Sequence, residues 1–296
     1  ADHRDVTYPK VAHEDNASLL LPGTSIRGAL RSHCSRIARS IVSDSEGSDE
    51  LTTSADVHKQ LAADPLLVRY LFGTTEYRGA VRVHNCEGQI PEDTGKDKPL
   101  KLTRNAIDRV TGSAAHRALY SELLYPHATW DPIVIEIDLK QLRRNICQDL
   151  DDCTLPDTHS EDQGDEHPAV KNRRRAAILL LTLTVVDLCE GLLPLGGGSG
   201  GGLGSIEVSK VSFSGLPGGK TGITERFDIP RARSDTNAVR KARAKNAEAI
   251  LRRVVSALGI SVATQANRSN VEQQALCVIR DASYPPQHLG RTQSFH

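Results

Sequence analysis

The sequence lacks methionine, any CxxC pair and a net charge at neutral pH. Its 37 basic residues balance 37 acidic residues. The chain as a whole therefore lacks the excess of positive charge that is typical of nucleic-acid-binding proteins, and any basic surface must be local. The six scattered cysteines argue against a zinc ribbon or a thioredoxin-type site, and they favour a reducing cytoplasm. Without methionine and with alanine at position 1, we expect the chain to be a fragment or a piece of a longer polypeptide.

Long uninterrupted apolar runs are also absent. The most apolar stretch, residues 176–195, contains Asp187 and Glu190 and follows three arginines. This pattern favours a buried helix over a membrane span or a signal anchor. At 296 residues, 38% of them hydrophobic and 25% charged, the chain is long enough for one large domain or two small ones. We therefore expect a cytoplasmic protein without a membrane partner.

Apolar periodicity predicts a mixed α+β chain. Helical spacing is found at residues 24–42, 176–193 and 234–258, with a short helix around Leu66 to Leu71; strand-like alternation is found at 78–86, 133–139, 206–213 and 275–279. Residues 1–19 and 149–172 are polar and are expected to be irregular. This order is typical of a split βαβ, ferredoxin-like sheet. Before the first helix we expect only a short strand that ends at Leu21, so the first strand of the fold would lie upstream of Ala1.

The stretch LLPGTSIRGALRS, residues 20–32, places a Pro-Gly break and two hydroxyl residues at the start of a helix with a basic side. The first amides of a helix have no internal partner and carry partial positive charge, so Thr24, Ser25, Arg27 and Arg31 could together receive an anion. The alternative is that Thr24 or Ser25 simply caps a core helix. Further along this helix, His33 and Cys34 are interpreted as packing residues, because no catalytic triad can be placed.

A glycine run at residues 196–204 has the flexibility to cradle a phosphate. Its order is the reverse of a dinucleotide-binding motif, because it follows a helix and precedes a strand, and no Lys-Ser/Thr follows as in a P-loop. The alternative is a flexible structural turn.

Four stretches in order resemble the RAMP superfamily of CRISPR-associated RNA-binding proteins. They are LPGTSIRGALRS (21–32), LFGTTEYRGAVRVHNC (71–86), NAIDRVTGSAAHRALYSELLYPHATWDPIVIEIDL (105–139) and LGGGSGGGLGSIEV (195–208). Within that superfamily the sequence is most similar to the backbone subunits of type III effector complexes, which stack along a guide RNA. The resemblance implies an antiviral role, a modified ferredoxin-like or RRM-like fold with a thumb-like hairpin insertion, and guide RNA, target RNA and other effector subunits as partners.

The resemblance also assigns RNA-binding residues. The PGTS turn and its helix would face the guide backbone through Thr24, Ser25, Arg27 and Arg31. The hairpin around residues 106–119, which contains Arg109, would wedge between guide and target and flip out a nucleotide. The glycine loop would support the guide, and its residues are Gly197, Gly198, Gly200, Gly202 and Gly204.

Catalytic members of the family have an aspartate before the PG turn that assists target-RNA cleavage by a divalent metal. Asp5 is the best match, both as catalytic residue and as metal ligand, and Asp2 is the next. The cofactor implied is Mg²⁺ or Mn²⁺ if the chain is an endoribonuclease, and none otherwise.

Two departures from the family pattern stand out. Where the family's glycine loop often carries an arginine and an aromatic residue, this sequence has Gly201 and Leu203. The tail has no clear counterpart, so we divide the chain into an RNA-binding domain, residues 1–227, and a helical extension, residues 228–296, that serves as linker or partner-binding segment. The alternatives are a structural subunit that cuts nothing, an unrelated enzyme whose glycine loop holds a nucleotide, and a histidine-dependent ribonuclease that processes guides.

Overall fold

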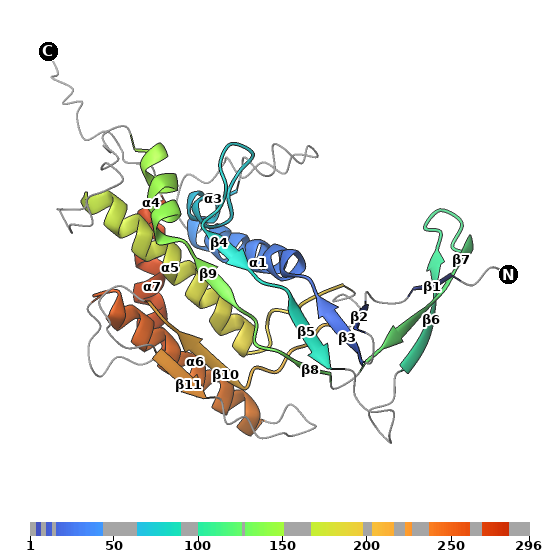
Figure 1. Ribbon diagram of the computed structural model, residues 1–296. Coiled ribbons are helices and arrows are strands. Elements are labelled where there is room, and N and C mark those ends of the chain that lie inside the picture. The colour runs from blue at the N-terminus through green and yellow to red at the C-terminus, as the bar shows by residue number, and fades with distance from the viewer. Residues whose placement is uncertain are drawn as a thin grey trace, which may run out of the picture. The chain divides into compact units, whose positions relative to one another are not determined.

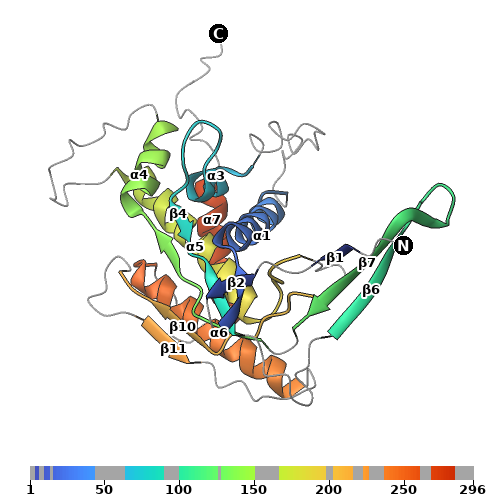
Figure 2. The same cartoon turned by 45° about the vertical axis from the view of Figure 1, so that its right-hand side comes forward.

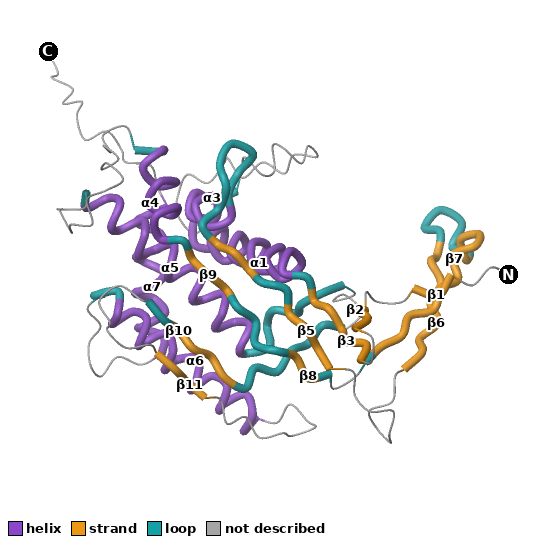
Figure 3. Tube along the Cα trace, viewed as in Figure 1, coloured by secondary structure: helices purple, strands orange, loops and turns teal. Residues whose placement is uncertain are grey.

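The computed structural model combines helices with small sheets (Figures 1 and 3). It describes residues 4–6, 10–13, 16–43, 64–89, 100–125, 128–150, 167–197, 203–215, 223–226, 237–260 and 268–283. The chain divides into two compact units, the first comprising Ala1–Ile26 and Val83–Ile135 and the second comprising Arg27–Arg82 and Glu136–His296. The mixed α+β class predicted from periodicity is therefore confirmed.

The first unit contains a four-stranded antiparallel sheet in the order β2-β3-β5-β8. Its strands are β2 (Lys10–His13), β3 (Asn16–Leu21), β5 (Cys86–Gln89) and β8 (Thr129–Trp130). The predicted strand ending at Leu21 is confirmed as β3. The prediction that residues 1–19 are irregular is wrong, because β2 pairs with β3 and a further short strand, β1 (Arg4–Val6), precedes them. Pairing along the backbone stabilises this polar segment, although its side chains show no apolar alternation.

The first unit also contains a long hairpin, which is visible in Figures 1 and 2. It consists of β6 (Leu100–Ile107) and β7 (Ala114–Leu124), and β1 pairs parallel to β7. At the tip, the Asp108 carboxylate accepts hydrogen bonds from the amides of Val110 and Thr111, and Gly112 adopts a positive φ of 68°. The hairpin predicted around residues 106–119 is confirmed.

The second unit is built around a long buried helix, α5 (Pro168–Cys189), which contacts α3 (Leu66–Phe72), α4 (Leu139–Gln148), α6 (Asn237–Ala257) and α7 (Arg268–Ser283). The side chains of Leu179, Leu180, Ile250, Leu251 and Ile279 are completely buried among these helices. Because α5 is covered on several sides, its apolar residues are explained by the protein core. In the part of the chain that the structure describes, no helix is long and apolar enough to cross a membrane.

An arginine of each of the helices α5 and α6 lies close to the C-terminal end of the other helix. The Arg243 guanidinium of α6 lies beside Gly191, just after the end of α5, and the Arg175 guanidinium of α5 lies beside Gly259, just after the end of α6. The last carbonyls of a helix carry partial negative charge, so a cation is stabilising at each of these two positions. The reciprocal pairing shows that the two helices are antiparallel.

Several predicted elements are confirmed and others are corrected. The helices at residues 24–42, 66–71 and 234–258 are confirmed as α1 (Gly23–Ser43), α3 and α6. The strand predicted at 275–279 is wrong, because these residues lie within α7, where Val271, Ala275 and Ile279 are buried at helical spacing. Helix α5 begins at Pro168, inside a segment that was predicted to be loop.

The remaining strands are short. β4 (Val81–Val83) pairs with β9 (Ile135–Ile137), and β10 (Lys210–Phe213) pairs with β11 (Ile223–Arg226). The first two fall within the predicted strands at 78–86 and 133–139, and β10 covers the second half of the one at 206–213. The predicted domain boundary at residue 227 lies outside the described residues.

Candidate nucleic-acid interface

The PGTS turn begins α1 at Gly23. The carbonyl oxygen of Pro22 accepts hydrogen bonds from the amides of Ser25 and Ile26, at 2.9 and 3.2 Å. The Gly23 amide donates to the side-chain oxygen of Asn85 at 2.9 Å. A Cβ atom at position 23 would lie 2.3 Å from the carbonyl oxygen of Val83, so only glycine fits here.

This arrangement tests the interpretation that Thr24 or Ser25 caps the helix. Thr24 and Ser25 lie inside the first turn of α1 and both are exposed. The interpretation that one of them caps the helix is wrong, because Asn85 contributes the capping oxygen. Two hydroxyl groups are therefore displayed at the positive end of a helix of 21 residues.

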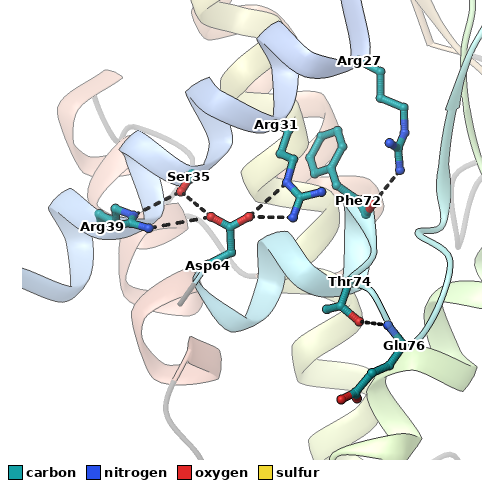
Figure 4. Close-up of polar contacts among 8 residues, drawn as sticks. All are labelled: Arg27, Arg31, Ser35, Arg39, Asp64, Phe72, Thr74 and Glu76. Carbon is teal, nitrogen blue, oxygen red and sulfur yellow. Dashed lines mark hydrogen bonds and ion pairs between the residues drawn. The ribbon is translucent and has the colours of Figure 1, made fainter. Parts of the chain in front are cut away.

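Arg27 is anchored on neutral groups, as Figure 4 shows in part. Its guanidinium donates to the carbonyl oxygens of Val81 and Phe72, and it lies 5.6 Å from the centre of the Phe72 ring. Burial, and next the charge of Arg31, lower the pKa of Arg27 from its usual value. Because neither carbonyl carries a formal charge, these two bonds orient the guanidinium without cancelling its positive charge.

Arg31 lies against a carboxylate. Its Nε and one terminal nitrogen donate to the same oxygen of Asp64, at 3.0 and 2.8 Å. Ser35 donates to the other oxygen at 3.2 Å, and a guanidinium nitrogen of Arg39 lies 3.7 Å from it (Figure 4). Arg31, Ser35 and Arg39 share one face of α1. Their partner Asp64 is distant in the sequence, so sequence reasoning missed it.

Small residues line the exposed side of α1 over its first three turns, and the exposed Arg36 follows them at the same spacing. Thr24, Gly28 and Ser32 follow one another at a spacing of four residues and all three are exposed. A Cβ atom at Gly28 would meet no heavy atom within 4 Å, so packing inside the chain does not require glycine there. Glycine is unfavourable inside a helix, and here it leaves the backbone open to close approach.

The glycine loop is closed by one backbone hydrogen bond, in which the Leu195 amide donates to the Gly204 carbonyl at 2.9 Å. Gly204 has a φ of +80°, and a Cβ atom there would lie 2.2 Å from the Leu195 carbonyl oxygen. Gly197 is exposed, with no heavy atom within 4 Å of its Cβ position. Gly198, Gly200 and Gly202 lie outside the described residues. Of the five glycines predicted to bind RNA, the two that the structure describes thus differ, since Gly204 is required by the fold of the loop and Gly197 is not.

The hairpin tip is exposed and partly apolar. Arg109 is exposed there as predicted, and Val110 and Ile107 are 93% and 63% exposed. Farther from the tip, Arg104 and Glu122 form an ion pair at 3.0 Å. Sequence reasoning missed Val110, although an apolar residue beside a turn was a visible signal.

The two candidate catalytic aspartates are described only in part. Asp5 lies in β1, where its Cα is paired with that of Ser121, which is paired in turn with Thr103. The hydroxyl groups of Thr103 and Ser121 lie 3.3 Å apart. Asp2 lies outside the described residues. Among the residues that the structure describes, no group of three or more His, Cys, Asp or Glu side chains could hold a metal ion.

His33 and Cys34 occupy the packed interface between α1 and α5. The two ring nitrogens of His33 lie 2.6 Å from an Asp187 oxygen and 2.8 Å from an Arg36 nitrogen. The Cys34 sulfur lies 3.0 Å from the Thr184 hydroxyl, and burial raises the pKa of this thiol to about 12. A thiol with this pKa is protonated at neutral pH, which agrees with the prediction that these are packing residues.

Comparison with known proteins gives one family. The sequence model of the RAMP superfamily matches residues 4–207, more than half of the chain. No curated protein matches. Among solved structures, a chain of "CRISPR RNA-guided surveillance complex, pre-nicking" is similar at 10% identity and a TM-score of 0.35, covering 91% of this chain and 93% of that chain.

Proposed function

Since the chain belongs to the RAMP superfamily, we propose that it binds a guide (crRNA) as a backbone subunit of a type III CRISPR effector complex. The observation that carries the proposal is the start of α1, where Asn85 provides the cap and the Thr24 and Ser25 hydroxyls are exposed. Hydroxyl groups at the positive end of a helix are good partners for a phosphate. The proposal includes the modified ferredoxin-like or RRM-like arrangement that the family resemblance implies.

The guide is held in this proposal through its backbone. Arg27 adds a positive charge that its two carbonyl partners do not cancel, and Gly28 lets a sugar-phosphate chain approach the helix closely. Backbone contacts position a nucleic acid without reading its sequence, which is the role required when base pairing selects the target. The exposed Gly197 of the glycine loop adds a second place where a backbone can approach.

The hairpin is the proposed wedge between guide and target RNA. Val110 and Ile107 present apolar side chains at its tip, and Arg109 lies between them in sequence. Apolar side chains that insert between bases disrupt stacking, and a neighbouring arginine holds the adjacent phosphates. The antiparallel pairing of β6 and β7, which has a register shift between Asn105 and Ile107, supports such a tip.

Target cleavage is the second part of the proposal, with Asp5 as metal ligand and Asp2 as the next candidate. Mg²⁺ commonly binds one or two protein carboxylates together with substrate phosphates, so a single aspartate near the RNA fits this cation or Mn²⁺. When bound, the metal would stabilise negative charge that develops on the reacting phosphate. The competing hypothesis is a structural subunit that binds the guide and cuts nothing.

The guide-binding proposal is tested by purifying the protein from its native host and sequencing the RNA that accompanies it. We expect RNAs of defined length that carry repeat-derived ends. A protein that purifies without RNA would contradict guide binding.

Cleavage is tested on the assembled complex with labelled target RNA and Mg²⁺ or Mn²⁺. Asp5→Ala should abolish cuts at regular intervals, whereas Asp281→Ala, at an exposed aspartate on α7, should leave them unchanged. If the unsubstituted complex cuts nothing, the structural hypothesis holds. If Asp5→Ala leaves cutting intact, the same comparison with Asp2→Ala decides whether that residue acts instead.

A further inference from the structure

We propose that Arg39 is a phosphate-binding residue on α1 and that Asp64 positions it together with Arg31. This inference rests on the proposed RNA binding and extends it beyond the PGTS turn. Arg31 and Arg39 are eight residues apart on one helix, about 12 Å along its axis at 1.5 Å per residue. A backbone that contacts the start of α1 could therefore continue along this face.

The exposed fraction of the side chain increases from the carboxylate to the two guanidinium groups. The Asp64 side chain is 11% exposed, whereas those of Arg31 and Arg39 are 22% and 34% exposed. The negative group is thus the most shielded of the three, and the positive groups are more accessible to a ligand. Two guanidinium groups share one carboxylate, so the cluster keeps one net positive charge.

The same contacts hold both arginines in place. Arg31 is fixed through two donors on one Asp64 oxygen, and Arg39 donates from Nε to the Ser35 hydroxyl at 3.2 Å while facing the other Asp64 oxygen. A guanidinium has five N–H donors, so these contacts leave others for a phosphate. Because orienting the side chains beforehand reduces the entropy lost on binding, a fixed arginine binds phosphate more tightly than a mobile one.

A competing role for Asp64 follows from the same geometry. The carboxylate could occupy the arginines so that RNA must displace it, in which case removing its charge would strengthen RNA binding. The greater burial of Asp64 favours positioning, since a displaced carboxylate would need to move out from beneath both guanidinium groups. The two roles predict opposite changes in affinity for the same substitution.

The experiment measures binding of the full chain to fluorescein-labelled single-stranded RNA at several salt concentrations. Arg39→Ala should weaken binding about tenfold, in the range of a charge-assisted contact. It should also reduce the slope of log K against log salt by about 0.7, the value for one phosphate of a single strand. Arg280→Ala, at an exposed arginine on α7 paired with Asp281, is the charge-matched control and should change neither quantity.

Asp64→Asn tests positioning, because it adds net positive charge and should nevertheless weaken binding and lower the salt slope. Tighter binding with a steeper slope would overturn the positioning role. Melting temperatures identify variants that unfold, and Arg39→Lys, which keeps the charge and loses the planar fork, should bind with intermediate affinity. Unchanged binding by Arg39→Ala overturns this inference alone, whereas no RNA binding by the unsubstituted chain contradicts the proposed function as well.

Discussion

The amide of Gly23 donates a hydrogen bond to the side chain of Asn85, 62 residues later in the sequence. This single bond satisfies the first donor of α1 from outside the helix. Thr24 and Ser25 are the two residues of the turn whose types are best suited to capping, but they do not cap α1. Asn85 therefore stabilises the start of α1, and the hydroxyl groups of Thr24 and Ser25 remain exposed.

Asn85→Ala should destabilise the protein by about 1 kcal/mol, the usual cost of losing a capping side chain. Ser25→Ala should change the free energy of unfolding by less than about 0.5 kcal/mol, because its side chain is exposed and does not cap. Urea denaturation of the two variants checks this order. A larger loss for Ser25→Ala than for Asn85→Ala would mean that the hydroxyl has a structural role.

Gly28→Ala should stabilise the isolated chain by about 1 kcal/mol, because alanine is the better helix former and the Cβ position is open. The same methyl group should weaken RNA binding if the guide backbone approaches this face. Thermal denaturation and RNA titration of the same preparation measure both effects. A stabilised variant with undiminished RNA affinity would show that RNA does not approach Gly28.

Two glycines of the 196–204 loop should respond differently to alanine. Gly204→Ala should cost about 1 to 3 kcal/mol, because the added methyl group overlaps the Leu195 carbonyl and the residue has a positive φ. Gly197→Ala should leave stability unchanged and reduce guide affinity, since nothing in the described chain surrounds that position. If Gly197→Ala binds the guide normally, the loop is a structural turn at this position.

Val110→Ser should leave the melting temperature unchanged, because the side chain is 93% exposed. In the assembled complex it should reduce the unstacking of target bases. A target RNA with a fluorescent adenine analogue reports this, since its emission increases when the base leaves the stack. Leu102→Ser, in β6 away from the tip, is the control. Equal emission with both variants and the unsubstituted chain would exclude Val110 as the wedge.

Local periodicity predicted the elements in which apolar side chains recur at a clear and regular spacing among polar ones. Helices α1 and α6 have such patterns, and the hairpin tip has turn chemistry that is readable from Asp108 to Ser113. The run at residues 275–279 was misassigned because five apolar residues are too short to separate a strand from a buried helix segment. Strands β1 and β2 were missed because they depend on backbone pairing rather than on side-chain pattern.

The partners of the site residues could not be predicted, because they are tertiary contacts. Nothing in the sequence near Arg27 indicates that it binds the carbonyl oxygens of Val81 and Phe72. Asp64 follows Arg39 by 25 positions, beyond any helical spacing. Sequence reasoning thus identified which cations lie on α1, and the structure shows which of them already have a carboxylate partner.

The most direct test of the account compares RNA binding by the unsubstituted chain with that of the double variant Thr24→Ala, Ser25→Ala. The account predicts similar affinity of the unsubstituted chain for single-stranded RNAs of unrelated sequence, decreasing as salt is raised. It predicts binding about tenfold weaker for the double variant at an unchanged melting temperature. Equal RNA binding by the two proteins, or none by the unsubstituted chain, would contradict the claim that the start of α1 holds the guide backbone.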